Sequence, residues 1–388
     1  MKVRTRKWDD DTLYRTAEFT VGDRTVQTPV KALELHKVPS GVVLDPKLGG
    51  VSECFRTVSK NQIAQWMTDS ERDRASMASI VSAQRRAHER GDVHVLVMQL
   101  DTTEITNREL AFVSDTAHSF SDVVTVPLEK DLHKAVKGAD SREFKRYVGF
   151  TRRFVEEVEK MNGKPLMAMV PSLPWQFTAD LTKVYLDLGM RAFCFDFAGR
   201  TPSATEERNI RPFLKELRQQ GIEEEVMLYA LNANTGKAGK RSDGKISPAK
   251  DILSFGFGFD VLGQKHIGLK GPKEMYAKMA KQGPTARLFD KDAYGYRKST
   301  LSGVGAVLPR DTQVSASAFR DSDVARGLQA YVNMEQQALE ANRLRRIIGE
   351  SSVPSYLQRK SAMEDSDRRR LKDARRSMSG MASLDDEW

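Results

Sequence analysis

Short apolar runs alternate along this chain with longer segments in which apolar residues recur at helical spacing. Typical runs are VHVLVMQL (93–100), RAFCFDF (191–197) and EVMLYAL (225–231). Apolar residues at successive positions are typical of a strand that is buried on both faces of a parallel sheet. The segments between the runs predict helices, so the pattern is one of repeated strand–helix units. The first helical segment runs from about residue 59 to 90, with Ser59 as its candidate N-cap. The same pattern predicts further strands at 42–45, 122–128, 165–170 and 258–263.

The number of these units favours a closed sheet. Seven or eight strand–helix units predict an α/β protein whose fold is a (β/α)8 TIM barrel rather than an open sheet. No G-x-G-x-x-G opens a helix after the first strand, so a dinucleotide-binding unit is not expected. We assign residues 1–283 to the barrel, together with an N-terminal hairpin.

The two ends of the chain depart from this repeat. Residues 17–30 alternate apolar and polar side chains around Gly22 and Asp23, which predicts a β-hairpin before the barrel. From residue 284 the strand–helix pattern stops, and we assign 284–388 to a mostly helical C-terminal region with a frayed polar tail. Within that region, residues 320–348 have apolar side chains at helical spacing and predict a long helix.

The composition is that of a globular protein with a polar surface, since 39% of the residues are hydrophobic and 30% are charged. The longest apolar runs are too short to cross a bilayer, and the N-terminus has no apolar segment of the kind that directs secretion. Cys54 and Cys194 stand alone in apolar surroundings, which argues against disulfides. We therefore expect a cytoplasmic protein with no membrane association.

The charge balance is basic. The chain has 62 Lys and Arg against 53 Asp and Glu, a net charge of +9. This excess favours a polyanionic partner, of which nucleic acid is the first candidate. The alternative is a basic enzyme whose lysines and arginines serve only to keep it soluble, and an excess of this size cannot decide between the two.

Four aspartates mark the ends of apolar runs: Asp45, Asp101, Asp196 and Asp260. In an α/β barrel the carboxyl ends of the strands converge on one mouth, where such folds build active sites. Several carboxylates at one mouth shift one another's pKa values, which suits acid–base or nucleophilic chemistry. The alternative for any single aspartate is that it caps the helix or turn that follows a strand.

Several segments, taken in order, resemble the tRNA-guanine transglycosylase superfamily. The hairpin at 17–30 leads into Thr-Pro-Val, as at the family's N-terminal entry. VVLDPKLGG (42–50) is similar to the family's strand that ends in Asp and is followed by two glycines. The resemblance covers residues 17–270 and continues through VMQLDTTE (97–104), FCFDFAGRTP (193–202) and GFGFDVLG (256–263).

This resemblance implies a barrel enzyme that exchanges guanine for a 7-deazaguanine through a covalent carboxylate–ribose intermediate. One branch of the family acts on tRNA and another on DNA. The tRNA enzymes carry a C-x-C-x-x-C…H zinc site after the barrel, whereas no cysteine follows Cys194 here. We therefore expect no metal and no cofactor. The expected partners are nucleic acid, with DNA favoured over tRNA, and a 7-deazaguanine base.

The resemblance also implies which residues bind the base. Asp101 stands at the position that reads the edge of the purine, and Asp196 is expected to assist there or to cap the following helix. Ala198 and Gly199 correspond to the glycine-bearing loop that lies under the base.

The nucleophile is where this chain departs from the family. The family's second aspartate is replaced by Gly263, which leaves Asp45 and Asp260 as the catalytic candidates. Asp260 lies three residues before Gly263, and in an extended strand such an offset points a side chain to the opposite face. It can replace the missing carboxylate only if a bulge or a strand end turns it round.

Basic residues in two loops, one directly after the last strand and one after the strand at 225–231, are candidates for contacts to the phosphates that flank a flipped nucleotide. For some of them a flexible, soluble loop or a purely structural role is the alternative. The candidates are Lys265, His266, Lys270 and Lys237.

Two other classes of function stay open. One is a non-catalytic barrel that binds nucleic acid or a partner subunit, which the glycine at 263 and the missing zinc ligands favour. The other is an unrelated barrel enzyme that acts on phosphorylated metabolites and uses the basic loops as its phosphate site.

Overall fold

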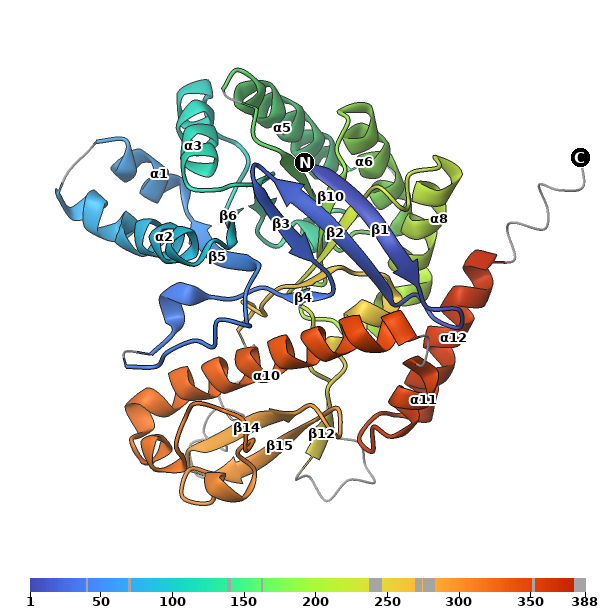
Figure 1. Ribbon diagram of the computed structural model, residues 1–388. Helices are drawn as coiled ribbons and strands as arrows, with labels where there is room; N and C mark the ends of the chain where they lie inside the picture. The colour runs from blue at the N-terminus through green and yellow to red at the C-terminus, as the bar shows by residue number, and fades with distance from the viewer. Residues whose placement is uncertain are drawn as a thin grey trace, which may run out of the picture.

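The computed structural model has a mixed α/β architecture with helices packed around parallel strands (Figure 1). The residues that it describes are 1–39, 41–68, 71–137, 141–161, 163–236, 246–268, 274, 283–350 and 353–379.

An antiparallel sheet precedes the parallel strands. It comprises β1 (Lys2–Trp8), β2 (Arg15–Val21) and β3 (Arg24–Gln27) in that order. The β2–β3 pair is the predicted hairpin, and Gly22 supplies the positive φ of 60° that its turn requires. Side chains of β2 alternate between buried and half-buried, which fits the alternation in the sequence.

Parallel strands form the centre of the molecule in two sheets (Figure 1). The larger has the order β4-β13-β11-β10-β9-β7, and the smaller has the order β5-β6-β8. Most of their residues are buried, as the apolar runs predict. The bounds are β4 (Val30–Lys31), β5 (Val51–Val58), β6 (Val93–Leu100), β7 (Val124–Thr125), β8 (Leu128–Glu129), β9 (Leu166–Val170), β10 (Ala192–Asp196), β11 (Met227–Leu231) and β13 (Val261–Leu262).

The two sheets meet at two places. Leu33, just after β4, forms a parallel bridge with Ser52 of β5. At the other side, β7 and β8 are separated by two residues, and they pair with different sheets: β7 with β9, and β8 with β6. One short stretch of chain therefore contacts both sheets.

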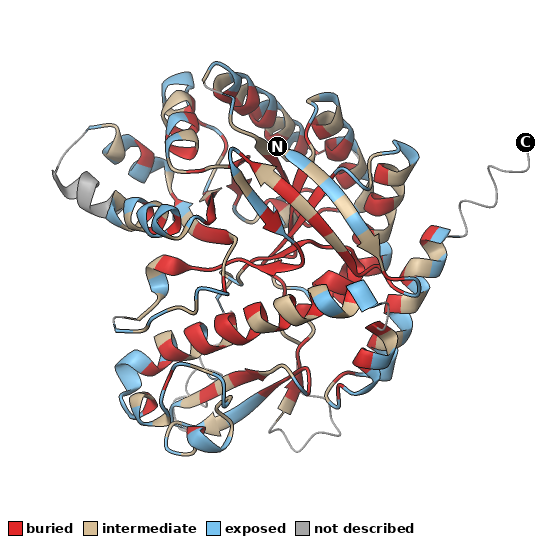
Figure 2. Cartoon of the chain, in the orientation of Figure 1, coloured by how far each residue is buried: buried red, intermediate tan, exposed pale blue. Residues whose placement is uncertain are grey.

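Helices cover the strands, and their buried faces point towards the sheets (Figure 2). Helix α1 begins as predicted after Ser59, whose hydroxyl accepts a hydrogen bond from the backbone N–H of Gln62 in a capping box. On α5, Tyr147, Phe150 and Phe154 are fully buried. The bounds are α1 (Lys60–Trp66), α2 (Glu71–Arg90), α3 (Asn107–Ser119), α4 (Leu132–Ala135), α5 (Arg142–Glu159), α6 (Trp175–Asp187), α7 (Pro202–Thr205) and α8 (Arg211–Gln219).

The predicted strand at 42–45 is wrong: this stretch, within the described residues, forms no strand. Val42 and Leu44 pack against the apolar cluster that includes Leu328 and Tyr331 of the C-terminal helix, while Val43 is 79% exposed. The alternation of these side chains therefore reflects a loop lying against a helix. The strand that follows is β5.

The C-terminal region contains the predicted long helix and also strands that the sequence pattern did not reveal. Helix α10 (Ser322–Glu350) contacts β14, β4 and β2. Strands β14 (Thr285–Asp290) and β15 (Gly295–Thr300) form a hairpin, and β15 also pairs with β12 (Ile246–Pro248). This small sheet joins residues on both sides of position 283. Two further helices follow, α11 (Val353–Gln358) and α12 (Asp365–Ser379).

None of the helices in the described part of the chain combines the length and the apolar character that crossing a membrane would require.

Candidate functional site

A cavity of about 370 Å³ lies at the carboxyl ends of the parallel strands. This is the end of a parallel α/β sheet at which ligands bind. Its walls come from six strands or the loops that follow them, and both apolar and polar side chains contribute. Among the lining residues are Phe55, Gln99, Leu128, Glu129, Lys130, Asp131, Ser172, Asp196, Ala198, His266 and Ile267.

Asp196, the last residue of β10, places a buried carboxylate in this cavity. Its Oδ1 accepts hydrogen bonds from the backbone N–H of Ala198 at 3.0 Å and from Nδ2 of Asn232 at 2.8 Å. Burial raises the pKa of Asp196, and these two hydrogen bonds partly oppose that rise. A carboxyl group with a raised pKa is suited to proton transfer.

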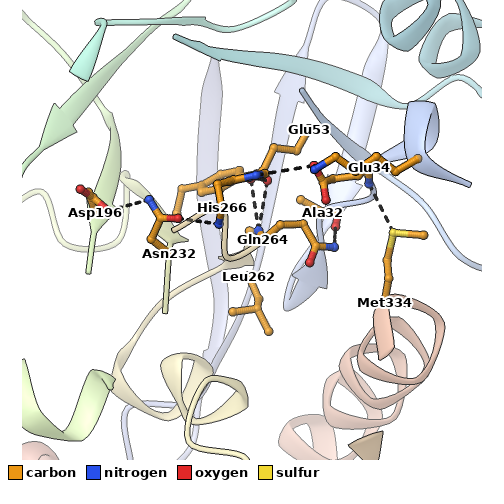
Figure 3. Close-up of polar contacts among 12 residues, drawn as sticks. Ala32, Glu34, Glu53, Asp196, Asn232, Leu262, Gln264, His266 and Met334 are labelled. Carbon is orange, nitrogen blue, oxygen red and sulfur yellow. Dashed lines mark hydrogen bonds and ion pairs between the residues drawn. The ribbon is translucent and has the colours of Figure 1, made fainter. Parts of the chain in front are cut away.

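A second buried carboxylate, that of Glu53, contacts the cavity-lining residue His266 (Figure 3). Glu53 of β5 is fully buried and accepts hydrogen bonds from Nε2 of His266 at 2.7 Å, from the backbone N–H of Gln264 at 3.1 Å and from the hydroxyl of Tyr229. Burial acts to raise the pKa of Glu53, but the hydrogen bond and charge of His266, the charge of Lys31 and the hydrogen bond from Tyr229 together outweigh it, so that this pKa lies below its ordinary value.

The imidazole of His266 is fixed from several sides. Besides its bond to Glu53, its Nδ1 lies 3.6 Å from Oε1 of Glu34, and its ring stacks on that of Phe55 with centroids 4.2 Å apart. Its side chain is 5% exposed. This environment defines one orientation for the ring at the cavity wall.

Backbone strain is concentrated around the cavity. Four non-glycine residues in the described part of the chain have positive φ. Asp131 (59°) and Ala198 (49°) line the cavity, and Asn232 (58°) donates to its Asp196. Positive φ angles are energetically costly for residues with a Cβ and are found more often at functional sites than elsewhere. Three of them at or beside this cavity therefore support a functional role for it.

Of the base-binding residues that the sequence predicts, Asp196 and Ala198 line the cavity. Gly199 is adjacent, and its N–H donates to the carbonyl of Asn232 at 3.1 Å. Asp101 is exposed at the end of β6, outside the described lining, and its Oδ1 accepts from the backbone N–H of Lys60 at 2.9 Å. This hydrogen bond holds Asp101 against the first turn of α1, whose N-cap is Ser59.

The two predicted catalytic aspartates are elsewhere. Asp45 lies in the loop before β5, where its Oδ1 accepts from the N–H of Lys47 at 2.8 Å and its charge acts on Tyr331 of α10. Neither Asp45 nor Asp260 is among the described residues that line the cavity. The expectation that they share one pocket with Asp101 therefore needs correction.

Asp260 lies at the opposite end of the sheet because it precedes β13 rather than ending it. A 3-10 helix (Ile252–Phe257) ends just before the predicted strand at 258–263, of which only Val261 and Leu262 form β13. The Asp260 carboxylate is fully buried and forms a salt bridge with Arg15, whose Nε donates to Oδ1 at 3.0 Å. It also accepts from the N–H of Leu228 at 2.8 Å, so its contacts are those of a structural residue.

Of the four residues predicted to contact phosphates, the structure describes Lys265 and His266. Lys265 is exposed beside the cavity, with its Nζ donating to Oδ1 of Asn234 at 3.0 Å. His266 is buried against Glu53 and therefore does not present its ring nitrogens as a phosphate ligand would. Lys237 and Lys270 lie outside the described residues.

Three residues of this region were missed from the sequence: Glu53, Asn232 and Lys31. Lys31 is buried and its Nζ donates to the carbonyls of Leu262 at 3.0 Å and Gly263 at 2.7 Å. A charged residue inside an apolar strand such as VSECFRTV was the available signal for Glu53, since burying a charge requires partners. Asn232 gave no comparable signal.

Within the described residues, no group of three or more Asp, Glu, His or Cys side chains gathers as a metal site would require. Both cysteines are free and buried, and burial raises the pKa of the Cys54 thiol to about 11. A scan against protein-family models finds no match to this chain, and a search of curated proteins finds none either.

Proposed function

We propose that this protein binds a purine-type base in the cavity and exchanges a guanine in nucleic acid for a free 7-deazaguanine, with DNA favoured over tRNA. The observation that carries the proposal is the buried carboxyl of Asp196, which lines the cavity with one oxygen fixed by two donors. A carboxyl group of this kind can both pair with the N–H groups of a base and exchange a proton with its ring nitrogen.

The fold that this function needs is a (β/α)8 barrel. We propose that eight parallel segments close into one ring, with residues 124–129 counted as one segment. The bridge between Leu33 and Ser52, and the pairing of β7 and β8 with opposite sheets, support this closure. An experimental structure with two unpaired edge strands would contradict it.

The walls of the cavity suit a planar base. Phe55, Leu128 and Ile267 offer apolar surface, and Gln99 and Ser172 add hydrogen-bonding groups. Sites for small ligands commonly combine apolar walls with a few polar groups that set orientation. A base flipped out of a nucleic acid would enter such a site edge first and pair with the polar groups at its floor.

Base exchange also needs a carboxylate at the sugar. With Asp45 and Asp260 away from the cavity, we assign this role to Asp131, a half-buried residue in the cavity lining. Of the two other carboxylates in the lining, Asp196 is assigned to the base, and Glu129 is held by Arg146 and by the hydroxyl of Thr103. Asp131 carries the positive φ noted above, and it forms an ion pair with Lys134 at 2.6 Å.

The proposed reaction has two balanced steps. A carboxylate oxygen of Asp131 bonds to the anomeric carbon while the bond from that carbon to the base breaks. The electron pair stays with the base nitrogen, which takes a proton from Asp196. The incoming base then returns a proton to Asp196 and displaces the carboxylate of Asp131.

The test is incorporation of radiolabelled guanine or 7-deazaguanine into duplex DNA and into tRNA. We expect label in DNA with the wild-type protein, and loss of incorporation in Asp196→Asn and Asp131→Asn. Asp131→Asn should also abolish any trapped protein–DNA adduct. Asp101→Asn is the matched control, because this strand-end aspartate is exposed and contacts α1. Label in neither polymer would contradict the enzyme proposal.

One observation favours a second candidate, a barrel that binds a base or nucleic acid without catalysis. A Cβ on Gly263 would lie 2.5 Å from Oε2 of Glu53 and 2.5 Å from Cε1 of Tyr229. The space for a side chain at the family's nucleophile position is thus filled. Base binding without incorporation or adduct would favour this candidate.

A further inference from the structure

Asn232 forms hydrogen bonds with two residues of the cavity wall, Asp196 and His266 (Figure 3). It directly follows β11 and is fully buried. Its side-chain Nδ2 donates to Oδ1 of Asp196 at 2.8 Å, and its Oδ1 accepts from the backbone N–H of His266 at 2.7 Å. One amide group therefore connects the end of β10 to the loop after β13.

The backbone of Asn232 makes two more links. Its N–H donates to the carbonyl of Gln264 at 3.0 Å, and its carbonyl accepts from the N–H of Gly199 at 3.1 Å. The main chain and side chain of Asn232 together connect, by hydrogen bonds, the segments that follow three neighbouring strands, β10, β11 and β13. One residue therefore contributes four of the hydrogen bonds that connect these loops.

The turn alone does not explain an asparagine here. Asn232 has a φ of 58°, a conformation that glycine adopts at no steric cost and that asparagine tolerates better than most residues. Glycine would satisfy the same backbone hydrogen bonds but would lack the amide. The side-chain bonds to Asp196 and His266 are what asparagine adds.

We propose that Asn232 is a positioning residue that acts through Asp196: its amide fixes the direction of the Asp196 carboxyl, so that the second oxygen of that group is left for the base. This rests on the proposed function, in which Asp196 contacts the base. The same amide accepts the hydrogen bond from the backbone N–H of His266. It therefore also fixes the position of His266 relative to Asp196.

The electrostatic consequence can be measured. Burial raises the pKa of Asp196, and the hydrogen bond from Asn232 lowers it. The other titratable groups that interact with this carboxyl are His266, Arg200, Tyr147 and Cys194. Removing the amide while leaving these groups in place should raise the pKa of Asp196 further.

The experiment is an NMR titration of protein labelled with 13C at aspartate Cγ, with the Asp196 signal assigned from Asp196→Asn. Asn232→Gly removes the amide but keeps the backbone bonds and relieves the strained φ, so it should fold. We expect its Asp196 midpoint at a higher pH than in the wild type. Asn232→Asp, which places a second carboxylate against Asp196, should shift the midpoint in the same direction and serves if Asn232→Gly does not fold.

Asn333 provides the matched control. Its side-chain amide, like that of Asn232, donates one hydrogen bond and accepts another: Nδ2 donates to the carbonyl of Arg287 at 3.0 Å, and Oδ1 accepts from the N–H of Phe289 at 2.8 Å. Asn333→Ala should lower stability but leave the Asp196 midpoint unchanged. A midpoint in Asn232→Gly equal to that of the wild type would overturn the proposal and leave Asn232 a purely structural residue.

Calorimetric binding of free guanine separates this inference from the proposed function. We expect Asn232→Gly to bind at least roughly tenfold more weakly than the wild type, and Asn333→Ala to bind as the wild type does. If the wild type binds no base, the proposed function fails, while the NMR midpoints still decide the role of Asn232. Unchanged base affinity in Asn232→Gly would contradict the positioning role.

Discussion

The carboxylate of Glu53 occupies the space into which a side chain at Gly263 would project. Oε2 of Glu53 lies 2.5 Å from the position of a Cβ at residue 263, far inside van der Waals contact. This oxygen is held by the hydroxyl of Tyr229 and cannot move aside without loss of that bond. A glutamate at 53 and an aspartate at 263 are therefore mutually exclusive in this packing.

Gly263→Asp should for this reason destabilise the protein rather than supply a nucleophile. Overpacking of a buried site costs about 1–3 kcal/mol, and a second buried carboxylate beside Glu53 adds to that cost. Urea unfolding followed by circular dichroism measures the change. Gly268→Ala is the control, since a Cβ there meets no described atom within 4 Å. A stable Gly263→Asp protein that gains base-exchange activity would contradict this account.

Asp260→Asn should unfold more easily without a change at the cavity. Breaking a buried ion pair by neutralising one partner costs about 3–5 kcal/mol, and the side chains of both Arg15 and Asp260 are 1% exposed. We expect the double variant Arg15→Met, Asp260→Leu to lose less stability than Asp260→Asn alone. Free-base affinity should stay at the wild-type level, because Asp260 lies at the other end of the sheet. A stable Asp260→Asn protein with lost activity would restore Asp260 as a catalytic candidate.

Stability should rise as the pH is raised from 8. Burial lowers the pKa of Lys31 to about 8 from an ordinary value of 10.5, so the folded protein releases this proton before the unfolded chain does. Between these values the unfolded chain holds more protons, and the free energy of unfolding increases with pH. Lys360, whose pKa burial also lowers to about 8, acts in the same direction.

Urea titrations at pH 8 and at about pH 9 measure this effect, before ionisation of tyrosines in the unfolded chain opposes it. Lys31→Met should reduce the increase, by an amount on the order of 1 kcal/mol, and the double variant with Lys360→Met should reduce it further. An increase of the same size in all three proteins would show that other groups cause it.

The cationic side chains beside the cavity should govern binding to nucleic acid but not to a free base. Lys130 lines the cavity, and Lys265 is exposed next to it. A plot of the logarithm of the binding constant for duplex DNA against the logarithm of the salt concentration has a negative slope. If each lysine contacts one phosphate, Lys130→Glu and Lys265→Glu should each reduce the magnitude of that slope by about 0.9. Lys183→Glu, an exposed site on α6, is the control. Equal slopes in all variants would place the phosphates elsewhere.

The elements that were predicted correctly are those whose sequence pattern lies within a few consecutive residues. The apolar runs at β6, β9, β10 and β11 became strands within one or two residues of the predicted bounds, and the Ser59 cap and helix α10 were also confirmed. Strand burial and helix capping depend on a few consecutive residues, so a single chain reveals them.

The candidate site was harder to predict because it depends on contacts between distant residues. Glu53 and His266 are 213 positions apart, and nothing in either segment specifies the other. The error at Asp260 has a simpler cause. The strand begins at Val261, and a shift of a few residues in its predicted start moves a side chain from one end of the sheet to the other.

The small sheet formed by β12, β14 and β15 has a consequence for how the chain folds during its synthesis. Ile246 of β12 pairs with Arg297 of β15, so β12 leaves the ribosome roughly fifty residues before its partner exists. Until β15 arrives, β12 has an open edge that another nascent chain could pair with. We therefore expect β12 to stay unpaired until the sequence up to residue 300 has been made, and a nascent chain that ends between these positions to aggregate more readily than the complete chain.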